Sequence, residues 1–194
     1  MTNNNILKIY KRSDFRAWLT KNHDKEIECY VLVKKGRPNY DIKILPYLDA
    51  VEEALCFGWI DTTTKSMDGG ILQKFTPRRK TALWSELNKE RVRRLEHLGL
   101  MTDAGRKMLP EMDADKFKFD DEVKEALVNS GAWDNFIKFP KLYQRIRIYN
   151  VCFYRKRDKV AYNKALQNLI EKTKEGKMYG EWNDYGRLLN WDKN

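Results

Sequence analysis

Apolar residues near the N-terminus follow first a helical period and then the composition of a strand. In SDFRAWLTKN, Phe15, Trp18 and Leu19 recur at positions i, i+3 and i+4, which predicts a short helix with Ser13 as its N-cap. The next segment, EIECYVLVKKG, is rich in Val, Ile and Tyr and ends at Gly36, so we expect a strand there.

The segment PYLDAVEEALCFG predicts a second helix. Pro46 suits the first turn of a helix, and Gly58 can supply the left-handed residue that ends one. The apolar stripe that we expect to face the core consists of Leu48, Val51 and Leu55. The outer face is expected to hold the acidic residues Asp49, Glu52 and Glu53.

A β-hairpin and a longer helix are predicted next. WIDTTTKSM and ILQKF are rich in strand-forming residues and flank Asp68-Gly69-Gly70, which is typical of a hairpin turn. FTPRRKT then leads into ALWSELNKERVRRLEHLG, where we expect a helix with Thr81 as its N-cap and Gly99 at its end. A short helix is expected in TDAGRKMLPEM.

The second half of the chain contains helical patterns alone. A polar linker, DADKFKFDDE at residues 113–122, precedes helical segments in DEVKEALVNSG, PKLYQRIRIYNVCFYRKR and DKVAYNKALQNLIEKTKEG, and an irregular aromatic tail follows. The sequence therefore predicts an α+β fold: a small N-terminal sheet with packed helices in residues 1–112, and a helical C-terminal region with an aromatic tail in residues 113–194.

The charge of the chain narrows the range of partners. The net charge is +10 and the pI is about 9.4, which favours anionic partners such as nucleic acid, phosphorylated metabolites or acidic lipid. The basic runs are spread over the chain, at Arg78-Arg79-Lys80, Arg91–Arg94, Arg155–Lys159 and Lys172–Lys177, which weakens the case for one dedicated groove. With no apolar run long enough to span a bilayer and no signal-peptide pattern at its start, the chain is expected in the cytoplasm.

The cysteines suggest structural roles. Cys29, Cys56 and Cys152 are widely spaced, stand among apolar neighbours and form no CxxC motif, so we expect buried thiols and neither a disulfide nor a metal site. A nucleophilic Cys56 would need exposure and a lowered pKa. No Gly-rich phosphate loop is present, and no cofactor is expected.

Several motifs together resemble a known family. EEALCFGWID is followed by a hairpin, by QKFTPRRKTALWSELNKERVRRL and by a small helix containing Gly105, while FRAWLTKNH and a strand ending in KKG precede it. In this order and spacing, they resemble the YdeI / OmpD-associated family, also described as bacteriocin-protection proteins. The resemblance implies a role in tolerance to stress or antimicrobial peptides, and it implies no particular reaction or catalytic residue.

The candidate ligand-binding residues lie between Trp59 and Trp84. The run Arg78-Arg79-Lys80, with Thr81, directly precedes the predicted helix, whose first N–H groups attract anions. Arg78 and Arg79 with the start of this helix could form an anion-binding corner. Asp61 could be a general base, or it could pair with one of the two arginines. Trp59 and Trp84 could stack on a base or sugar, or they could be core residues.

We therefore expect a protein that acts by binding an anionic small molecule or protein partner and that is not an enzyme. One alternative is a nucleic-acid-binding module, for which weak and non-specific binding is expected at most. The other alternative is a small enzyme with an Asp61–arginine pocket.

Overall fold

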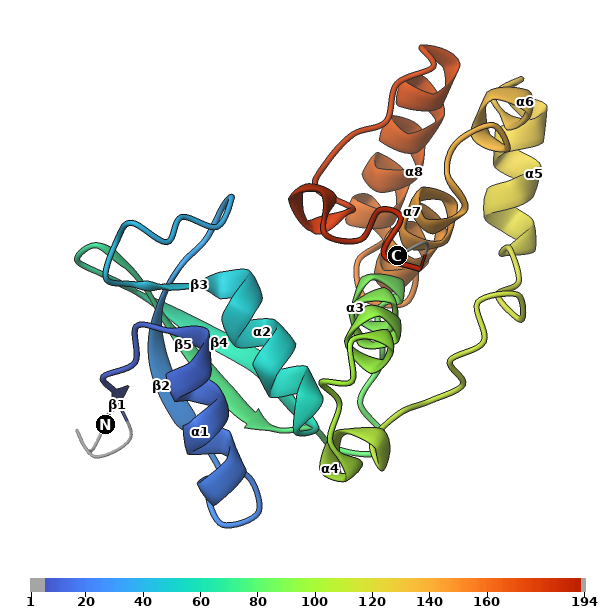
Figure 1. Ribbon diagram of the computed structural model, residues 1–194. Helices are drawn as coiled ribbons and strands as arrows, with labels where there is room; N and C mark the ends of the chain where they lie inside the picture. The colour runs from blue at the N-terminus through green and yellow to red at the C-terminus, as the bar shows by residue number, and fades with distance from the viewer. Residues whose placement is uncertain (1–5, 193–194) are drawn as a thin grey trace. The chain divides into compact units, whose positions relative to one another are not determined.

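A computed structural model of the chain describes residues 6–192 (Figure 1). Among these residues, five strands form one mixed sheet and eight α-helices are present, which confirms the predicted α+β class.

The chain divides into two compact units. The first unit holds the chain up to Leu83, Arg91–Pro110 and the residues from Asn190, and the second holds Trp84–Glu90 and Glu111–Leu189. These units differ from the predicted ranges 1–112 and 113–194 at residues 84–90, at residues 111–112 and at the end of the chain.

The sheet belongs to the first unit. Its strands are β1 (Ile6–Leu7), β2 (Cys29–Lys34), β3 (Leu45–Pro46), β4 (Trp59–Met67) and β5 (Gly70–Pro77), in the order β1-β2-β5-β4 with β3 also paired to β2. β1 and β3 are parallel to β2, whereas β2–β5 and β5–β4 are antiparallel. The predicted hairpin is confirmed as β4–β5. Gly69 supplies a positive φ of 77° in its turn, and a bulge lies between Asp61 and Thr64.

Two helices, α1 (Arg12–Asn22) and α2 (Tyr47–Cys56), lie on one face of this sheet (Figure 1). The predicted apolar face of α1 packs inward, with the ring of Phe15 5.3 Å from that of Phe75 on β5. The predicted cap of α1 is wrong, because Ser13 lies inside the first turn and the N-cap, Lys11, makes no side-chain cap bond.

Helix α3 (Glu86–His97) begins later than the sequence predicted. The hydroxyl of Ser85 accepts a hydrogen bond from the backbone N–H of Asn88 at 3.1 Å, as an N-cap side chain does. Thr81 lies in a turn before the helix, so its predicted capping role is wrong. Ser and Thr are both good caps, and local sequence alone did not choose between them.

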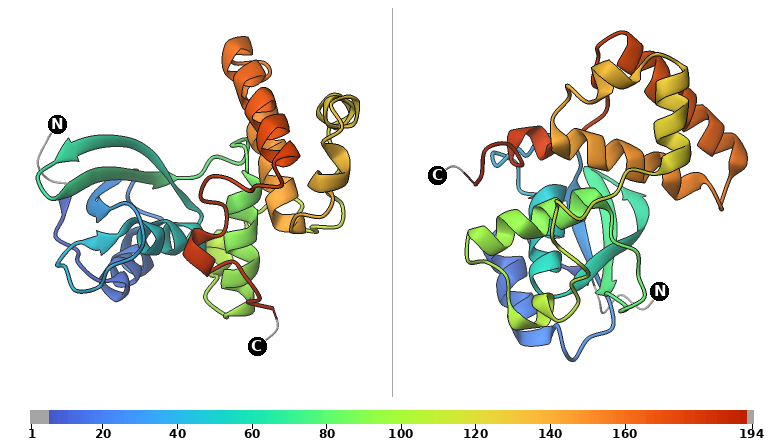
Figure 2. Two further views of the ribbon diagram at one scale, coloured as in Figure 1. Left: turned by 90° about the horizontal axis from the view of Figure 1, so that it is seen from above. Right: turned by 90° about the vertical axis from the view of Figure 1, so that its right-hand side faces the viewer.

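The second unit is helical. It contains α5 (Asp121–Asn129), the short α6 (Trp133–Phe136), α7 (Lys141–Tyr154) and α8 (Lys159–Lys174), and α7 and α8 pack side by side (Figure 2). Its core is rich in aromatic rings, with Phe136 and Tyr143 fully buried. The tail contributes to this core, because Trp182 and Leu188 are buried against it.

No helix within residues 6–192 is long and apolar enough to cross a bilayer. No group of three or more His, Cys, Asp or Glu side chains in the same range is placed to hold a metal ion. All three cysteines are free thiols.

Candidate functional site

Helix α2 carries three carboxylates into the protein interior. Asp49, Glu52 and Glu53 are 2%, 0% and 1% exposed, so the predicted solvent-facing position of these acids is wrong. One side of α2 faces the sheet, and α1 packs against another side. Because burying an unpaired charge is costly, each carboxylate needs a compensating cation.

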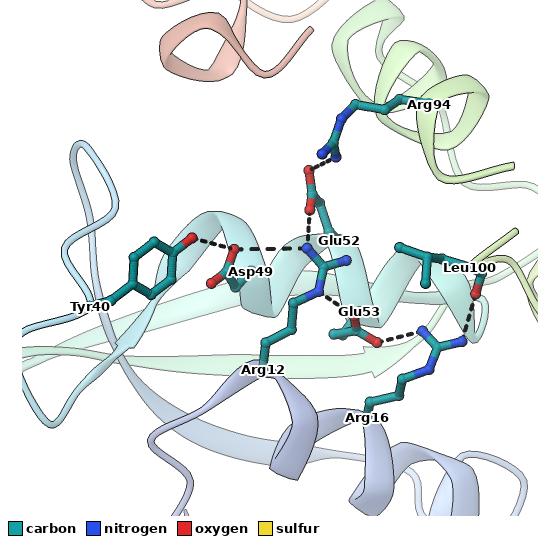
Figure 3. A network of polar contacts seen from close by, with 8 residues as sticks. All are labelled: Arg12, Arg16, Tyr40, Asp49, Glu52, Glu53, Arg94 and Leu100. Carbon is teal, nitrogen blue, oxygen red and sulfur yellow. Dashed lines mark hydrogen bonds and ion pairs between the residues drawn. The ribbon is translucent and has the colours of Figure 1, made fainter. Parts of the chain in front are cut away.

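Arginines from two other helices supply those cations (Figure 3). Arg12 donates from Nε to Glu53 at 2.5 Å and from Nη1 to Glu52 at 2.6 Å. Arg16 donates to the second oxygen of Glu53 at 2.8 Å, and Arg94 of α3 donates to the second oxygen of Glu52 at 2.9 Å. We call these residues the acid–arginine network, and it also includes Asp49, which lies 3.9 Å from Arg12.

The carboxylates of the acid–arginine network are all engaged by guanidinium groups, although Nη2 of Arg12 is buried without a hydrogen-bond partner. Burial disfavours the charged form of Arg12, but the charges of Glu52 and Glu53 outweigh this effect and raise its pKa. Every carboxylate of the network faces a guanidinium, so the network holds α1, α2 and α3 together and does not present a free base. The signal in the sequence was the presence of three acids in an otherwise apolar helix, but nothing local identified their partners.

The network fixes α2, and the end of α2 shapes a surface hollow. Thr102, at the start of α4 (Asp103–Arg106), donates from its hydroxyl to the Cys56 carbonyl at 2.6 Å. Gly58 follows with a φ of 72°, and a Cβ there would lie 2.9 Å from Cγ of Met108 and 3.0 Å from the Ala104 carbonyl. A glycine is therefore required by both its backbone conformation and the close approach of the neighbouring chain.

Beside Gly58 lies a hollow of about 700 Å³, which we call the Gly58 basin. Its lining consists of His23, Asp24, Phe57, Gly58, Trp59, Pro77, Arg78, Lys80, Ala104, Lys107 and Met108. Three of these side chains are cations and one, Asp24, is a carboxylate, so the lining is positive. Lys80 and Lys107 are exposed. Lys80 belongs to the basic run singled out from the sequence, whereas Lys107 was not identified there.

The two predicted arginines have different environments. Arg78 lines the basin but is buried, and its backbone N–H donates to the Gly58 carbonyl at 2.8 Å. Its Nη1 donates to the Leu83 carbonyl at 3.0 Å. Arg79 is exposed and is not part of the basin lining. Since α3 begins at Glu86, the N–H groups of residues 82–84 do not form the helix N-terminus that the predicted anion-binding corner required.

The remaining candidates are core or hairpin residues. Trp59 is buried and donates from its indole N–H to the His23 carbonyl at 3.1 Å, while Trp84 is buried and belongs to the second unit. Neither ring is exposed enough to stack on a base or a sugar. Asp61 is half-buried and accepts a hydrogen bond from the Tyr47 hydroxyl at 2.8 Å, in place of the predicted pairing with an arginine.

Cys56 is fully buried, as the sequence predicted. Burial, followed by the nearby charge of Glu53, raises the pKa of its thiol to about 12, whereas burial raises the pKa of half-buried Cys152 to about 11. We expect native Cys56 to resist iodoacetamide at pH 8, because the thiolate is the reactive species, and Cys152 to be alkylated first. Mass spectrometry of timed samples measures both rates. Rapid modification of Cys56 would restore it as a candidate nucleophile.

The geometry defines an α+β protein with a buried, ion-paired helix and a basic hollow at its end. A family model described as Domain of unknown function (DUF8412) matches residues 7–108, just over half of the 194 residues. The chain belongs to this family. The match spans the sheet, the acid–arginine network and the Gly58 basin. Neither a curated protein nor a solved structure matches the chain significantly.

Proposed function

We propose that this protein binds an anionic small molecule or an anionic partner in the Gly58 basin and does not transform it chemically. The observation that supports this most is the charge of the lining, in which Arg78, Lys80 and Lys107 stand against one carboxylate, Asp24. Cations gathered around a hollow raise the local concentration of anions. The exposed ammonium groups of the two lysines can reach a ligand, and the buried Arg78 adds a fixed positive charge behind them.

The reactive groups near the basin favour binding over catalysis. Cys56, two residues before Gly58, is a buried thiol with a raised pKa. Asp61 already accepts a hydrogen bond from Tyr47. The carboxylates of α2 are held by arginines. The basin therefore offers charges that can hold an anion, while these candidate nucleophiles and bases are engaged elsewhere.

The physiological role that we propose is tolerance to stress or antimicrobial peptides in the cytoplasm. It rests on the resemblance to the YdeI / OmpD-associated family, and binding in the Gly58 basin would be its molecular activity. Survival of bacteria expressing the wild type or a basin variant, after challenge with an antimicrobial peptide, tests this part. If bacteria expressing the basin variant survive as well as bacteria expressing equal amounts of the wild type, binding in the Gly58 basin does not contribute to tolerance.

Replacing both exposed lysines of the basin, Lys80→Met with Lys107→Met, is expected to weaken anion binding about tenfold, because two partly screened charges are lost. Calorimetric titration with inorganic phosphate, citrate and a short single-stranded DNA measures the effect. Both side chains are exposed, so the melting temperature should change little.

Arg79→Met is the matched control, since it removes one charge next to Lys80 from a side chain outside the basin lining. The comparison for this control is the single substitution Lys80→Met, which also removes one charge. If Arg79→Met weakens binding as much as Lys80→Met does, the attraction is due to net charge and the basin is not the site. If the DNA binds more tightly than the small anions and its affinity falls steeply with salt, the nucleic-acid alternative is favoured instead.

A further inference from the structure

Arg147, in the middle of α7, is a buried cation without a carboxylate partner. It is 7% exposed, and within residues 6–192 no carboxylate lies at ion-pair distance from it. Its Nη2 donates to the Tyr179 carbonyl at 2.5 Å, and its Nε has no hydrogen-bond partner. The guanidinium carbon lies 5.1 Å and 4.4 Å from the ring centres of Tyr143 and Tyr179. Ring contacts offset part of the cost of burying this charge, but they do not neutralise it.

The neighbouring arginine on the same helix shows how such a charge is normally compensated. Arg145 is also largely buried, with 12% of its side chain exposed. It lies 2.8 Å from a carboxylate oxygen of Glu90 and 3.5 Å from one of Glu86. Arg147 has no such pair within residues 6–192, so its positive charge is left without a neutralising carboxylate.

Arg147 also lines a cavity of about 360 Å³ in the second unit. We call this cavity the α7–α8 pocket. The lining residues that matter here are Arg147, Asn150, Phe153, Tyr154, Asn168 and Tyr179. Arg147 is the one ionised side chain of the lining, whose other members are amides, aromatic rings and small apolar groups. The volume is at the lower end of the range for small-molecule sites.

The lining indicates which chemical class of ligand would fit. A guanidinium matches a carboxylate as a planar fork. One positive charge balances a monoanion, whereas a phosphate monoester, with a charge of about −1.5 to −2, would be left partly uncompensated. Phe153 and Tyr154 are partly exposed aromatic rings at the pocket, which offer apolar surface to a flat ring.

We propose that the α7–α8 pocket binds a small aromatic carboxylate. The carboxylate pairs with Arg147, and the ring packs against Phe153 and Tyr154. Asn150 and Asn168 add polar side chains to the lining. This site lies in the second unit and does not depend on anion binding in the Gly58 basin of the first.

Titration of the full chain with four simple probes tests the ligand class. Benzoate is expected to bind with a dissociation constant of about 1 mM or lower, a reasonable affinity for so small a ligand. Benzamide lacks the charge and acetate lacks the ring, so each is expected to bind at least about tenfold more weakly. NMR shift perturbation can place the site at α7 and α8. Benzamide binding as tightly as benzoate, or inorganic phosphate binding more tightly, would overturn the proposal.

Two variants test the residues. Arg147→Met removes the charge and is expected to weaken benzoate binding at least about tenfold. Because Arg147 is buried and its loss can disturb folding, Ala165→Leu provides an independent test, since it narrows the pocket and leaves the arginine in place. The control is Lys164→Met, an exposed lysine that lines the adjacent hollow but not this pocket, and it should change affinity less than about twofold. A folded Ala165→Leu protein that binds benzoate like the wild type would place the ligand elsewhere.

Discussion

Replacing Glu52 by glutamine is expected to destabilise the first unit by about 3 to 5 kcal/mol, because it removes a buried negative charge that two partly buried guanidinium groups share. Glu52 is 0% exposed and bridges Arg12 at 2.6 Å and Arg94 at 2.9 Å. The substitution keeps the size of the side chain and removes its charge, so the loss measures electrostatics more than packing. Thermal unfolding followed by circular dichroism should show a midpoint lower by about 10 °C.

A second ion pair in the same unit provides the control. Glu96 lies 2.8 Å from Arg106, with 47% and 43% of these side chains exposed. Water and salt screen exposed pairs, so Glu96→Gln should shift the unfolding midpoint by no more than about 1 °C. Equal effects of Glu52→Gln and Glu96→Gln would show that the acid–arginine network contributes no more than a surface pair and would refute its proposed structural role.

Gly105→Ala is expected to cost about 3 kcal/mol or more, because there is no space for the added methyl group. A Cβ at Gly105 would lie 2.3 Å from the carbonyl oxygen of Cys56 and 2.8 Å from its carbonyl carbon. That carbonyl belongs to the end of α2 and accepts two hydrogen bonds from Thr102, so it cannot move aside without breaking them. Chemical denaturation, with circular dichroism as the readout, measures the loss.

Gly176→Ala separates steric overlap from backbone strain. Gly176 has a φ of 66°, and a Cβ there would meet nothing within 4 Å, so this change should cost about 1 kcal/mol through its left-handed backbone alone. If Gly105→Ala costs no more than Gly176→Ala, α4 must be able to move away from α2, and the close packing beside the Gly58 basin would not be essential.

Much of the secondary structure was predictable from the sequence. The apolar spacing of Phe15, Trp18 and Leu19 matches α1, and WIDTTTKSM corresponds residue for residue to β4. The predicted helices of the second half contain α5, α7 and α8, and the polar segment before α5 is irregular. These features depend on neighbours a few residues apart, so a local pattern is enough to specify them.

The candidate site was only partly predictable. Arg78 and Lys80 were identified and do line the Gly58 basin. Lys107 was not identified, because it follows α4, and the approach of α4 to Gly58 is a tertiary contact. The proposed anion-binding corner depended on where α3 begins. Both Thr81 and Ser85 are good cap residues, and only the folded chain selects Ser85.

By itself, the sequence determined the α+β class, the hairpin, the buried thiol of Cys56 and the basic surface. Tertiary structure alone decided which charges are buried and what compensates them. Glu52 meets Arg12 and Arg94 from 40 and 42 positions away along the chain, so no local pattern could reveal that it points inward. Arg145 and Arg147 stand two residues apart in one helix. Arg145 faces carboxylates, whereas Arg147 faces none among residues 6–192. The free energy of a buried charge depends on the groups that surround it in the folded protein, and chain order does not specify those groups.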